Sequence, residues 1–292
     1  MFDVIGFGAL NVDKILLVDK IPAADQGCHV QKEEMIGGGS AANTVYNLSM
    51  MGHNTGQIGK IGNDSEGAFF LETLGDVDTT GIKAVEGKTG VAYVLVTARG
   101  DRAIVVNPGV NDFVGIDDIE FSYLNCRYLH LTSFACSHSA KSFETQKKLI
   151  KKLECRVTFD PGNMYSSMGL KALKEIIERT YAILPTKEEI ETMTGLGYRK
   201  AAEKLLNCGC SIVVVTLGEK GCYLRTETEE KYVKAQKVQV RDTTGAGDAF
   251  NAGFLSGLLE ERSLEDCCKL GNRTASRVIQ QYGARIQNIS MR

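Results

Sequence analysis

The sequence lacks the features that mark several large classes of protein. Its 292 residues carry a net charge of −2, so no excess of basic side chains indicates binding to nucleic acid. No apolar run approaches the ~20 residues that a membrane-spanning helix needs, and we expect no membrane partner. Residues 1–6 have the pattern of a strand and not of a signal peptide, so we expect a cytoplasmic protein.

Metal-binding and disulfide patterns are also missing. The nine cysteines form no Cys-x-x-Cys pair, and the four histidines show no helical ligand spacing. A cysteine in an apolar context, such as Cys222 beside Tyr223, packs as a small hydrophobic side chain. We therefore expect free cysteines in a reducing compartment. The chain also contains no Gly-x-x-x-x-Gly-Lys-Ser/Thr phosphate loop.

What the sequence has is a regular alternation of short apolar runs and helical patterns. This alternation predicts an α/β fold with a mostly parallel central sheet and helices on both faces. Strands are expected at 2–8, 57–61, 128–132, 156–160, 181–184 and 211–216. Helices are expected at 40–51, 65–74, 139–153, 171–179, 187–192, 199–206, 247–259 and 264–282. Ligands bind beyond the carboxyl ends of such strands, where loops 8–11, 160–163 and 184–186 lie.

Two segments interrupt the alternation. Residues 12–35 and 88–106 have the pattern of extended strands, and the charged stretch 98–102 reads as a hairpin turn. These strands would form a small antiparallel sheet outside the main one, which suggests a lid over the binding crevice. An ordinary pair of edge strands explains the pattern equally well. Without repeats or a flexible linker, residues 1–292 are expected to form a single domain.

The first candidate motif spans residues 5–13. It imitates the glycine fingerprint of dinucleotide-binding proteins, but Asn11 stands at the third glycine position and no helix pattern follows. We therefore exclude an NAD site here. Asn11 and Asp13 remain as hydrogen-bonding partners for vicinal hydroxyl groups, or as side chains that stabilise a turn.

The second motif is a run of three glycines ahead of a helix. Gly38 and Gly39 allow a ligand to approach the backbone closely, and Asn43 falls in the first turn of the helix that follows. Asn43 would then face the same space as the glycines. Because glycine runs are often simple turns, this motif alone is only moderately specific.

The third motif is the most informative one. Residues 241–250 read Arg-Asp-Thr-Thr-Gly-Ala-Gly-Asp-Ala-Phe and open into a helix. Free amide groups of Gly245, Ala246 and Gly247 at the positive end of that helix would bind an anion such as phosphate. Asp248 beside this site would repel phosphate, so it is better suited to move a proton. A plain glycine-rich helix cap does not account for both flanking aspartates.

With these motifs the chain resembles the PfkB (ribokinase-like) carbohydrate kinases over essentially its whole length. Residues 242–250 match the C-terminal signature of that family, and residues 38–43 match its N-terminal signature. The resemblance implies a β-strand lid and transfer of the γ-phosphate of ATP, with Mg²⁺, to a hydroxyl of a sugar or nucleoside, usually a primary CH₂OH. Asp248 aligns with the catalytic base and the amides of residues 245–247 with the anion hole. The aligned sugar-binding positions are Asn11, Asp13, Gly38, Gly39 and Asn43.

The resemblance also indicates where the nucleotide would lie. Thr216, Gly218 and Gly221 match the strand-end turn beside the nucleotide, and Asn272 matches an asparagine of the adenine pocket. In some members the positions of Asp242 and Thr244 hold a monovalent cation, so potassium use is implied as an option. A homodimer formed through the lid is a further option that the resemblance provides.

Two departures from the family pattern bear on the metal and on the acceptor. In the Asn-x-x-Glu motif that organises magnesium through water, Glu189 is present but Thr186 replaces the asparagine. Bacterial ribokinases place a ribose-binding glutamate near the end of the central strand. This chain has no acid in Leu131-Thr132-Ser133-Phe134, and Phe134 could lie against a nucleobase. The second departure favours nucleosides over ribose.

Other functions remain open at this point. The acceptor could be another small alcohol or a sugar phosphate, although a sugar phosphate calls for additional Arg or Lys and the sugar-side motifs are neutral. A non-catalytic, sugar-sensing relative is a third option, but such a protein could dispense with the base, and Asp248 is kept in full context. The sequence does not identify the acceptor.

Overall fold

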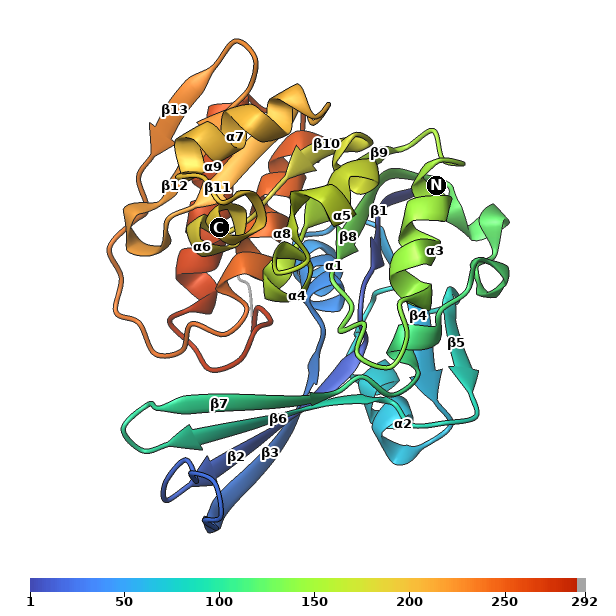
Figure 1. Ribbon diagram of the computed structural model, residues 1–292, viewed down its shortest axis with the longest axis vertical. Helices are drawn as coiled ribbons and strands as arrows, with labels where there is room; N and C mark the ends of the chain where they lie inside the picture. The colour runs from blue at the N-terminus through green and yellow to red at the C-terminus, as the bar shows by residue number, and fades with distance from the viewer. Residues whose placement is uncertain (288–292) are drawn as a thin grey trace.

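The computed structural model describes residues 1–287, which form a nine-stranded sheet with helices and a separate four-stranded sheet (Figure 1). The order of the large sheet is β13-β12-β11-β10-β9-β8-β1-β4-β5. Its strands are β1 (Phe2–Phe7), β4 (Thr55–Gly62), β5 (Ile82–Val85), β8 (Cys126–Thr132), β9 (Arg156–Asp160), β10 (Thr180–Ile183), β11 (Ile212–Thr216), β12 (Cys222–Arg225) and β13 (Glu230–Val233).

Helices connect these strands. They are α1 (Ser40–Met50), α2 (Ser65–Glu72), α3 (Lys141–Ile150), α4 (Gly162–Ser166), α5 (Gly169–Ile177), α6 (Lys187–Thr194), α7 (Tyr198–Asn207), α8 (Ala246–Leu259) and α9 (Leu264–Val278). Short 3₁₀ segments are η1 (Gly109–Phe113), η2 (Ile116–Asp118), η3 (Phe121–Leu124) and η4 (Gly218–Lys220). No helix within residues 1–287 is long and apolar enough to span a membrane.

The prediction of a mostly parallel sheet is confirmed. From β11 through β10, β9, β8, β1 and β4 to β5, every neighbouring pair is parallel. Only β12 and β13 run antiparallel to their neighbours, and they extend the sheet at one edge. The sequence pattern missed β5, β12, β13 and α4, because each is five residues or shorter and such a segment carries too little periodicity.

Alternate residues of the central strands pack on opposite faces of the large sheet. Ile5, Val213 and Val215 belong to one buried cluster, whereas the neighbouring residues Val4 and Val214 belong to the other. Helices α3, α5, α6 and α7 contribute to the first cluster, and α1, α8 and α9 contribute to the second. Strands buried on both faces have few polar residues, which is why the sequence pattern predicted them correctly.

The helix boundaries follow local capping chemistry. Thr186 and Glu189 form a reciprocal capping box at the start of α6, and Gly195 ends that helix in the left-handed region with φ 69°. Asp64 caps α2 by accepting a hydrogen bond from the Gly67 amide. The helix predicted for 264–282 ends at Val278, four residues early, because the chain turns there toward the functional site.

Residues from the two irregular segments form a four-stranded sheet with the order β3-β2-β6-β7. Its strands are β2 (Asn11–Val18), β3 (Val30–Gly38), β6 (Gly90–Thr97) and β7 (Arg102–Asn107), and Figure 1 shows them projecting from the main body. The sheet is mixed and not purely antiparallel as predicted, since β2 and β6 run parallel. Both strands leave the large sheet in the same direction, and β3 and β7 return beside them.

All nine cysteines lie within the described residues and are free. This agrees with the prediction made from their spacing. Cys126, Cys210, Cys222, Cys267 and Cys268 are buried, so they pack as small hydrophobic side chains. Residues 1–287 contain no cluster of three or more His, Cys, Asp or Glu side chains that could hold a metal ion.

Candidate active site

The two glycine motifs meet at the side chain of Asp248. Gly245 caps α8 with φ 71°, a conformation that glycine adopts without strain, and Asp248 lies in the first turn. Its Oδ1 accepts a hydrogen bond from Ser40 Oγ at 2.5 Å, and its Oδ2 accepts one from Asn43 Nδ2 at 2.9 Å. Both donors lie in the first turn of α1. The contact therefore joins the starts of two helices that are about 200 positions apart in the chain.

The environment of Asp248 suits a group that takes up a proton. Burial raises the pKa of Asp248. The hydrogen bonds from Ser40 and Asn43 and the positive charge of Arg285 favour the ionised carboxylate and oppose this rise. A carboxylate that is both oriented and more basic than usual is a candidate general base.

The amide groups ahead of Asp248 are only partly free. The Ala246 N–H donates to the Thr243 carbonyl oxygen at 3.2 Å and closes a turn before the helix. The prediction of three free amides is therefore wrong for Ala246. The N–H groups of Gly245 and Gly247 have no protein acceptor within residues 1–287, and they lie at the positive end of α8. These two amides remain as donors for an anion.

A cavity of about 840 Å³ lies on one side of Asp248. Thr216, Gly218, Gly221 and Asn272, which were predicted to border a nucleotide, all line it. Ala246 and Gly247 line the same cavity, as do Thr186, Glu188, Phe250, Ala275, Ser276 and Ile279. The structure thus places the predicted nucleotide residues and Gly247, which carries one of the two free amides, around a single space.

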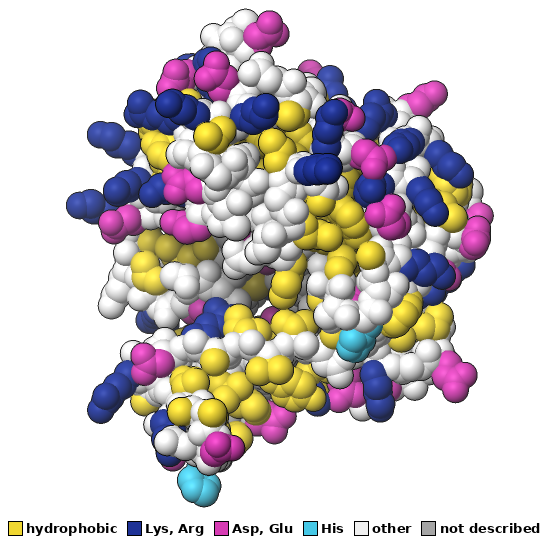
Figure 2. Space-filling view, in the orientation of Figure 1, with side chains coloured by type: hydrophobic (Ala, Val, Ile, Leu, Met, Phe, Trp, Pro, Cys, Tyr) yellow, Lys and Arg dark blue, Asp and Glu magenta, His cyan; other side chains and the backbone are white. Residues whose placement is uncertain are grey.

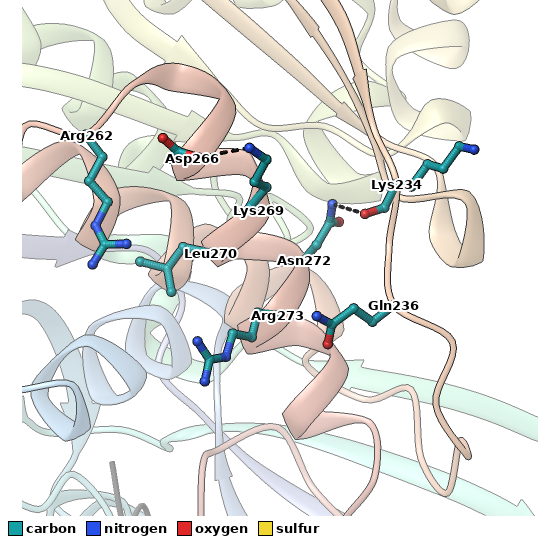
Figure 3. Close-up of a pocket in the computed structure, with 8 residues that line it drawn as sticks. All are labelled: Lys234, Gln236, Arg262, Asp266, Lys269, Leu270, Asn272 and Arg273. Carbon is teal, nitrogen blue, oxygen red and sulfur yellow. Dashed lines mark hydrogen bonds and ion pairs between the residues drawn. The ribbon is translucent and has the colours of Figure 1, made fainter. Parts of the chain in front are cut away.

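Asn272 shapes the wall of this cavity. Its Nδ2 donates to the carbonyl oxygen of Val233 at 3.1 Å and to that of Lys234 at 3.4 Å. Figure 3 shows the second of these hydrogen bonds. The side chain is 6% exposed, so it ties α9 to the segment that follows β13. Beyond that segment lies a smaller pocket of about 290 Å³, lined by Lys234, Gln236, Arg262, Asp266, Lys269, Leu270, Asn272 and Arg273.

The predicted acceptor residues lie at the junction of the two sheets. Asn11 starts β2, and its Oδ1 accepts a hydrogen bond from Asn111 Nδ2 at 2.9 Å. Asn111, which the sequence analysis did not identify, also binds both the N–H and the carbonyl oxygen of Leu10. The side chain of Asn111 is 1% exposed. It therefore fixes the loop that carries Asn11.

Gly38 lies against the Asp13 carboxylate, and Gly39 lies against the backbone of Ala9. A Cβ on Gly38 would lie 2.3 Å from an Asp13 carboxylate oxygen, and a Cβ on Gly39 would lie 2.2 Å from the Ala9 carbonyl oxygen. At Gly39, with φ 93° and a backbone atom in the way, only glycine fits, whereas a side chain at Gly38 would displace the Asp13 carboxylate. Burial raises the pKa of Asp13 to about 6, with Arg285 and Arg102 opposing the rise and Asp248 adding to it. The charge of the candidate base Asp248 therefore acts on Asp13.

The segment that follows α9 was missed by the sequence analysis, which extended the helix to residue 282. Asn47 Nδ2 donates to the Ala284 carbonyl oxygen at 3.2 Å, and the Ile286 N–H donates to Asn47 Oδ1 at 2.8 Å. Arg285 Nε donates to Asn43 Oδ1 at 3.0 Å. This segment therefore lies directly against α1 and supports the asparagine that binds Asp248.

Two further carboxylates face the site from the large sheet and α6. Glu189 is buried, and its Oε2 accepts a hydrogen bond from the Thr186 N–H at 2.8 Å. Asp160, at the carboxyl end of β9, accepts one from Asn251 Nδ2 at 2.6 Å. Burial and then the charges of Glu189 and Asp248 raise the pKa of Asp160, and burial raises the pKa of Glu189. The negative charge of Asp248 thus acts on both Asp160 and Glu189 and favours a cation nearby, although the described residues contain no group of three acidic side chains close enough to hold a metal directly.

Asp242 and Thr244, the predicted monovalent-cation residues, are bonded to each other. Asp242 Oδ1 accepts hydrogen bonds from the amide and hydroxyl of Thr244, and Oδ2 accepts one from the Gly283 amide. Burial acts to raise the pKa of Asp242, but these hydrogen bonds outweigh it and lower the pKa. Arg102, at the start of β7, donates from a guanidinium nitrogen to the Thr244 hydroxyl at 3.3 Å. The outer sheet therefore reaches the loop that carries Asp248.

The interpretation of Phe134 as a surface for a nucleobase is wrong. Its side chain is 1% exposed and lies in the core, where its ring packs edge-on against Phe7 with centroids 5.5 Å apart. The apolar residues around it are part of the buried cluster on one face of the large sheet. Phe134 can therefore contact neither a nucleoside nor ribose, and it gives no reason to prefer nucleosides.

Comparison with known proteins agrees with this site. The model of the pfkB family of carbohydrate kinases matches residues 1–290. An uncharacterized sugar kinase of Archaeoglobus fulgidus is 42% identical over 241 residues, covering 82% of this chain and 96% of that protein. The ATP-dependent ribose-1-phosphate kinase of Halopiger xanaduensis is 31% identical, covering 98% of this chain and 94% of that protein.

The fold agrees as well. The crystal structure of ribokinase from Thermotoga maritima is similar with a TM-score of 0.86 and 27% identity, covering 97% of this chain and 95% of that chain. The predicted ribokinase-like α/β fold class is confirmed by this likeness.

Gly247 offers a test of the anion site that leaves the fold intact. A Cβ at Gly247 would meet no protein atom within 4 Å, so a larger side chain there fills the cavity and not the core. We expect Gly247→Val to weaken ATP binding about tenfold or more in calorimetry, because the side chain occupies the place of a phosphate. Gly197, which also has no atom within 4 Å of a Cβ, provides the control Gly197→Val. Equal ATP affinity in both variants would contradict the assignment of the anion site.

Proposed function

Since the chain belongs to the pfkB family of carbohydrate kinases, we propose that it transfers the γ-phosphate of ATP to a hydroxyl group, preferentially a primary CH₂OH, of a sugar or nucleoside. One observation carries this proposal. The Asp248 carboxylate, held by Ser40 and Asn43, lies between the amide-lined cavity and the side of the site that carries Asp13.

In this proposal Asp248 accepts the proton of the attacking hydroxyl group. The hydroxyl oxygen must come within about 2.6–3.2 Å of the carboxylate for this transfer. Asn11 and Asp13 orient the acceptor, and the close contacts of Gly38 and Gly39 leave room for it beside the backbone. The amides of Gly245 and Gly247 stabilise the charge that develops on the phosphate oxygens. The protein thus supplies positioning and charge stabilisation and forms no covalent intermediate.

The residues present fit a magnesium requirement. Burial is the main cause of the raised pKa values of Glu189 and Asp160, and the charges of neighbouring carboxylates add to the rise. A divalent cation would offset that neighbouring negative charge. In this proposal Glu189, whose Oε2 accepts a hydrogen bond from the Thr186 amide, would hold the metal through a water molecule. A bound Mg²⁺ neutralises charge on the phosphates of ATP. The role of Asp242 and Thr244 in binding potassium stays a prediction.

We propose that the four-stranded sheet acts as a lid. Strands β2 and β3 carry Asn11, Asp13 and Gly38 at their inner ends, and Arg102 of β7 reaches the Thr244 hydroxyl. Closure of such a sheet over the acceptor excludes water, which would otherwise compete as the nucleophile. Arg102 then places a positive charge near the point where the phosphoryl group is transferred.

A phosphorylated sugar is a second candidate acceptor. Such a substrate calls for additional cationic side chains, and the guanidinium group of Arg102 lies within electrostatic reach of Asp13. The relative in Halopiger xanaduensis is named as a ribose-1-phosphate kinase. With Phe134 buried, the structure gives nucleosides no matching support.

An ADP-release assay against a panel of acceptors tests these candidates. The panel contains ribose, fructose, ribose 1-phosphate, fructose 6-phosphate, adenosine and cytidine. We expect turnover with at least one acceptor, and Arg102→Met should raise KM for a phosphorylated acceptor more than for a neutral one, because only the former needs the charge. If no acceptor stimulates ADP release, the alternative of a non-catalytic, sugar-sensing protein is favoured instead.

The role of Asp248 has a test of its own. Asp248→Asn keeps the size of the side chain and removes the proton acceptor, so we expect kcat to fall about 10²-fold or more while ATP binding, measured by calorimetry, is retained. Asp266→Asn is a matched control because Asp266 is exposed on α9, away from Asp248. Near-normal turnover in Asp248→Asn would remove the assignment of the base.

We also propose that the lid forms a homodimer. Met35, Tyr93 and Val105 occupy one row across the four-stranded sheet, and they are 39%, 38% and 60% exposed. Figure 2 shows hydrophobic side chains gathered over this sheet. Exposed apolar groups of this kind favour association. We expect a dimer in sedimentation at micromolar concentration and a monomer for Val105→Lys, and a monomeric unsubstituted protein would disprove the proposal.

A further inference from the structure

Arg285 occupies a position that neither the motifs nor the comparisons single out. It lies in the segment after α9, and its guanidinium group contacts three other parts of the chain. Nε donates to Asn43 Oδ1 at 3.0 Å, a terminal nitrogen donates to the Thr73 carbonyl oxygen at 2.5 Å, and the group stacks over the Tyr46 ring at 5.0 Å. A Cβ on Gly37 would come within 2.8 Å of the guanidinium nitrogens. The surroundings therefore fix this side chain tightly.

The contact with Asn43 determines which way its amide faces. A guanidinium group has only donors, so the atom of Asn43 that faces Arg285 must be the carbonyl oxygen. The amide nitrogen of Asn43 is thereby turned to the opposite side, where it donates to Asp248 Oδ2 at 2.9 Å. Without Arg285, the amide could rotate by half a turn and direct an oxygen at the carboxylate.

We propose that Arg285 is a positioning residue that fixes the amide of Asn43 and thereby orients the Asp248 carboxylate toward the acceptor hydroxyl. The proposal rests on the proposed function, in which Asp248 is the base. Arg285 has no place on the phosphate or the acceptor in this proposal. It acts through Asn43 and through its charge.

The charge has a second consequence. Asp13 on β2, Asp160 at the end of β9 and Glu189 on α6 face Asp248 and add negative charge to its surroundings. Arg285 opposes them, since its positive charge lowers the pKa of both Asp13 and Asp248. Burial lowers the pKa of Arg285 itself to about 10, so the group stays protonated at neutral pH.

Arg285→Met tests the proposal because methionine retains much of the length without the donors or the charge. We expect the pKa of Asp248 to rise and the acid limb of the kcat/KM profile to move to higher pH. The value of kcat should fall about tenfold or more, with KM for ATP unchanged. Arg277, exposed on α9, provides the matched control Arg277→Met, which should behave as the unsubstituted protein.

Two further variants separate positioning from a purely structural role. Arg285→Lys restores the charge but not the Nε donor. The acid limb of its kcat/KM profile should therefore return to the position found in the unsubstituted protein, while kcat stays reduced. In a double-mutant cycle with Asn43→Ala, a residue that acts through Asn43 gives losses in kcat that do not add. Additive losses, or full kcat in Arg285→Lys, would overturn the proposal.

A measurement without substrate makes the result independent of the acceptor. Carbon-13 signals of labelled aspartate carboxyl groups can be titrated in the unsubstituted protein, in Arg285→Met and in Arg277→Met, with Asp248→Asn assigning the signal. A rise in the pKa of Asp248 only in Arg285→Met supports the proposal, even if the protein transfers phosphate to no acceptor of the panel. An unchanged Asp248 titration in a folded Arg285→Met protein, judged by its thermal unfolding, contradicts it.

Discussion

The hydrogen-bonded contact between the first turns of α1 and α8 is the constraint on which the rest of the site depends. Asp248 from one helix accepts hydrogen bonds from Ser40 and Asn43 of the other. Each helix begins at a glycine in the positive φ region, Gly39 and Gly245. The two positive helix ends are thereby brought together on one carboxylate, which helps to keep the negative charge of Asp248 in a partly buried place.

The fold brings these helix ends together through its sheet topology. Strand β2 leaves the large sheet just after the carboxyl end of β1, and β3 returns beside it and leads directly into α1. The segment after α9 contacts both the loop before α8 and helix α1. The Gly283 amide donates to Asp242 in that loop, and the Ile286 amide donates to Asn47 of α1. A Cβ on Gly245 would lie within 2.4 Å of Ala284 atoms. The site is thus closed by three chain segments that are remote in the sequence.

Local patterns in the sequence predicted the parts of this arrangement that have a local cause. Buried parallel strands, a glycine-capped helix and a carboxylate in its first turn all leave a readable signature. Phe134 was misread because an aromatic residue at a strand end looks the same whether it is buried or exposed. Arg285 could not be found in this way, since its partner Asn43 is 242 positions away and no periodicity links the two. Ala246 was misassigned because a turn that uses its amide has no separate signature.

The acidic side chains of the site lower the stability of the folded protein. The pKa values of Asp13, Asp160, Glu189 and Asp248 are all raised, so the folded chain binds protons more tightly there than the unfolded chain does. Such an acid does not destabilise the fold below its pKa in the unfolded chain, near pH 4. As the pH rises above that value, the loss of stability grows until the pH exceeds the pKa of the acid in the folded protein. For Asp13 this window extends to about pH 6. These carboxylates therefore destabilise the free protein at neutral pH, and cationic ligands reduce that cost. The fold thus loses stability because its active site needs a proton acceptor and a cation site close together.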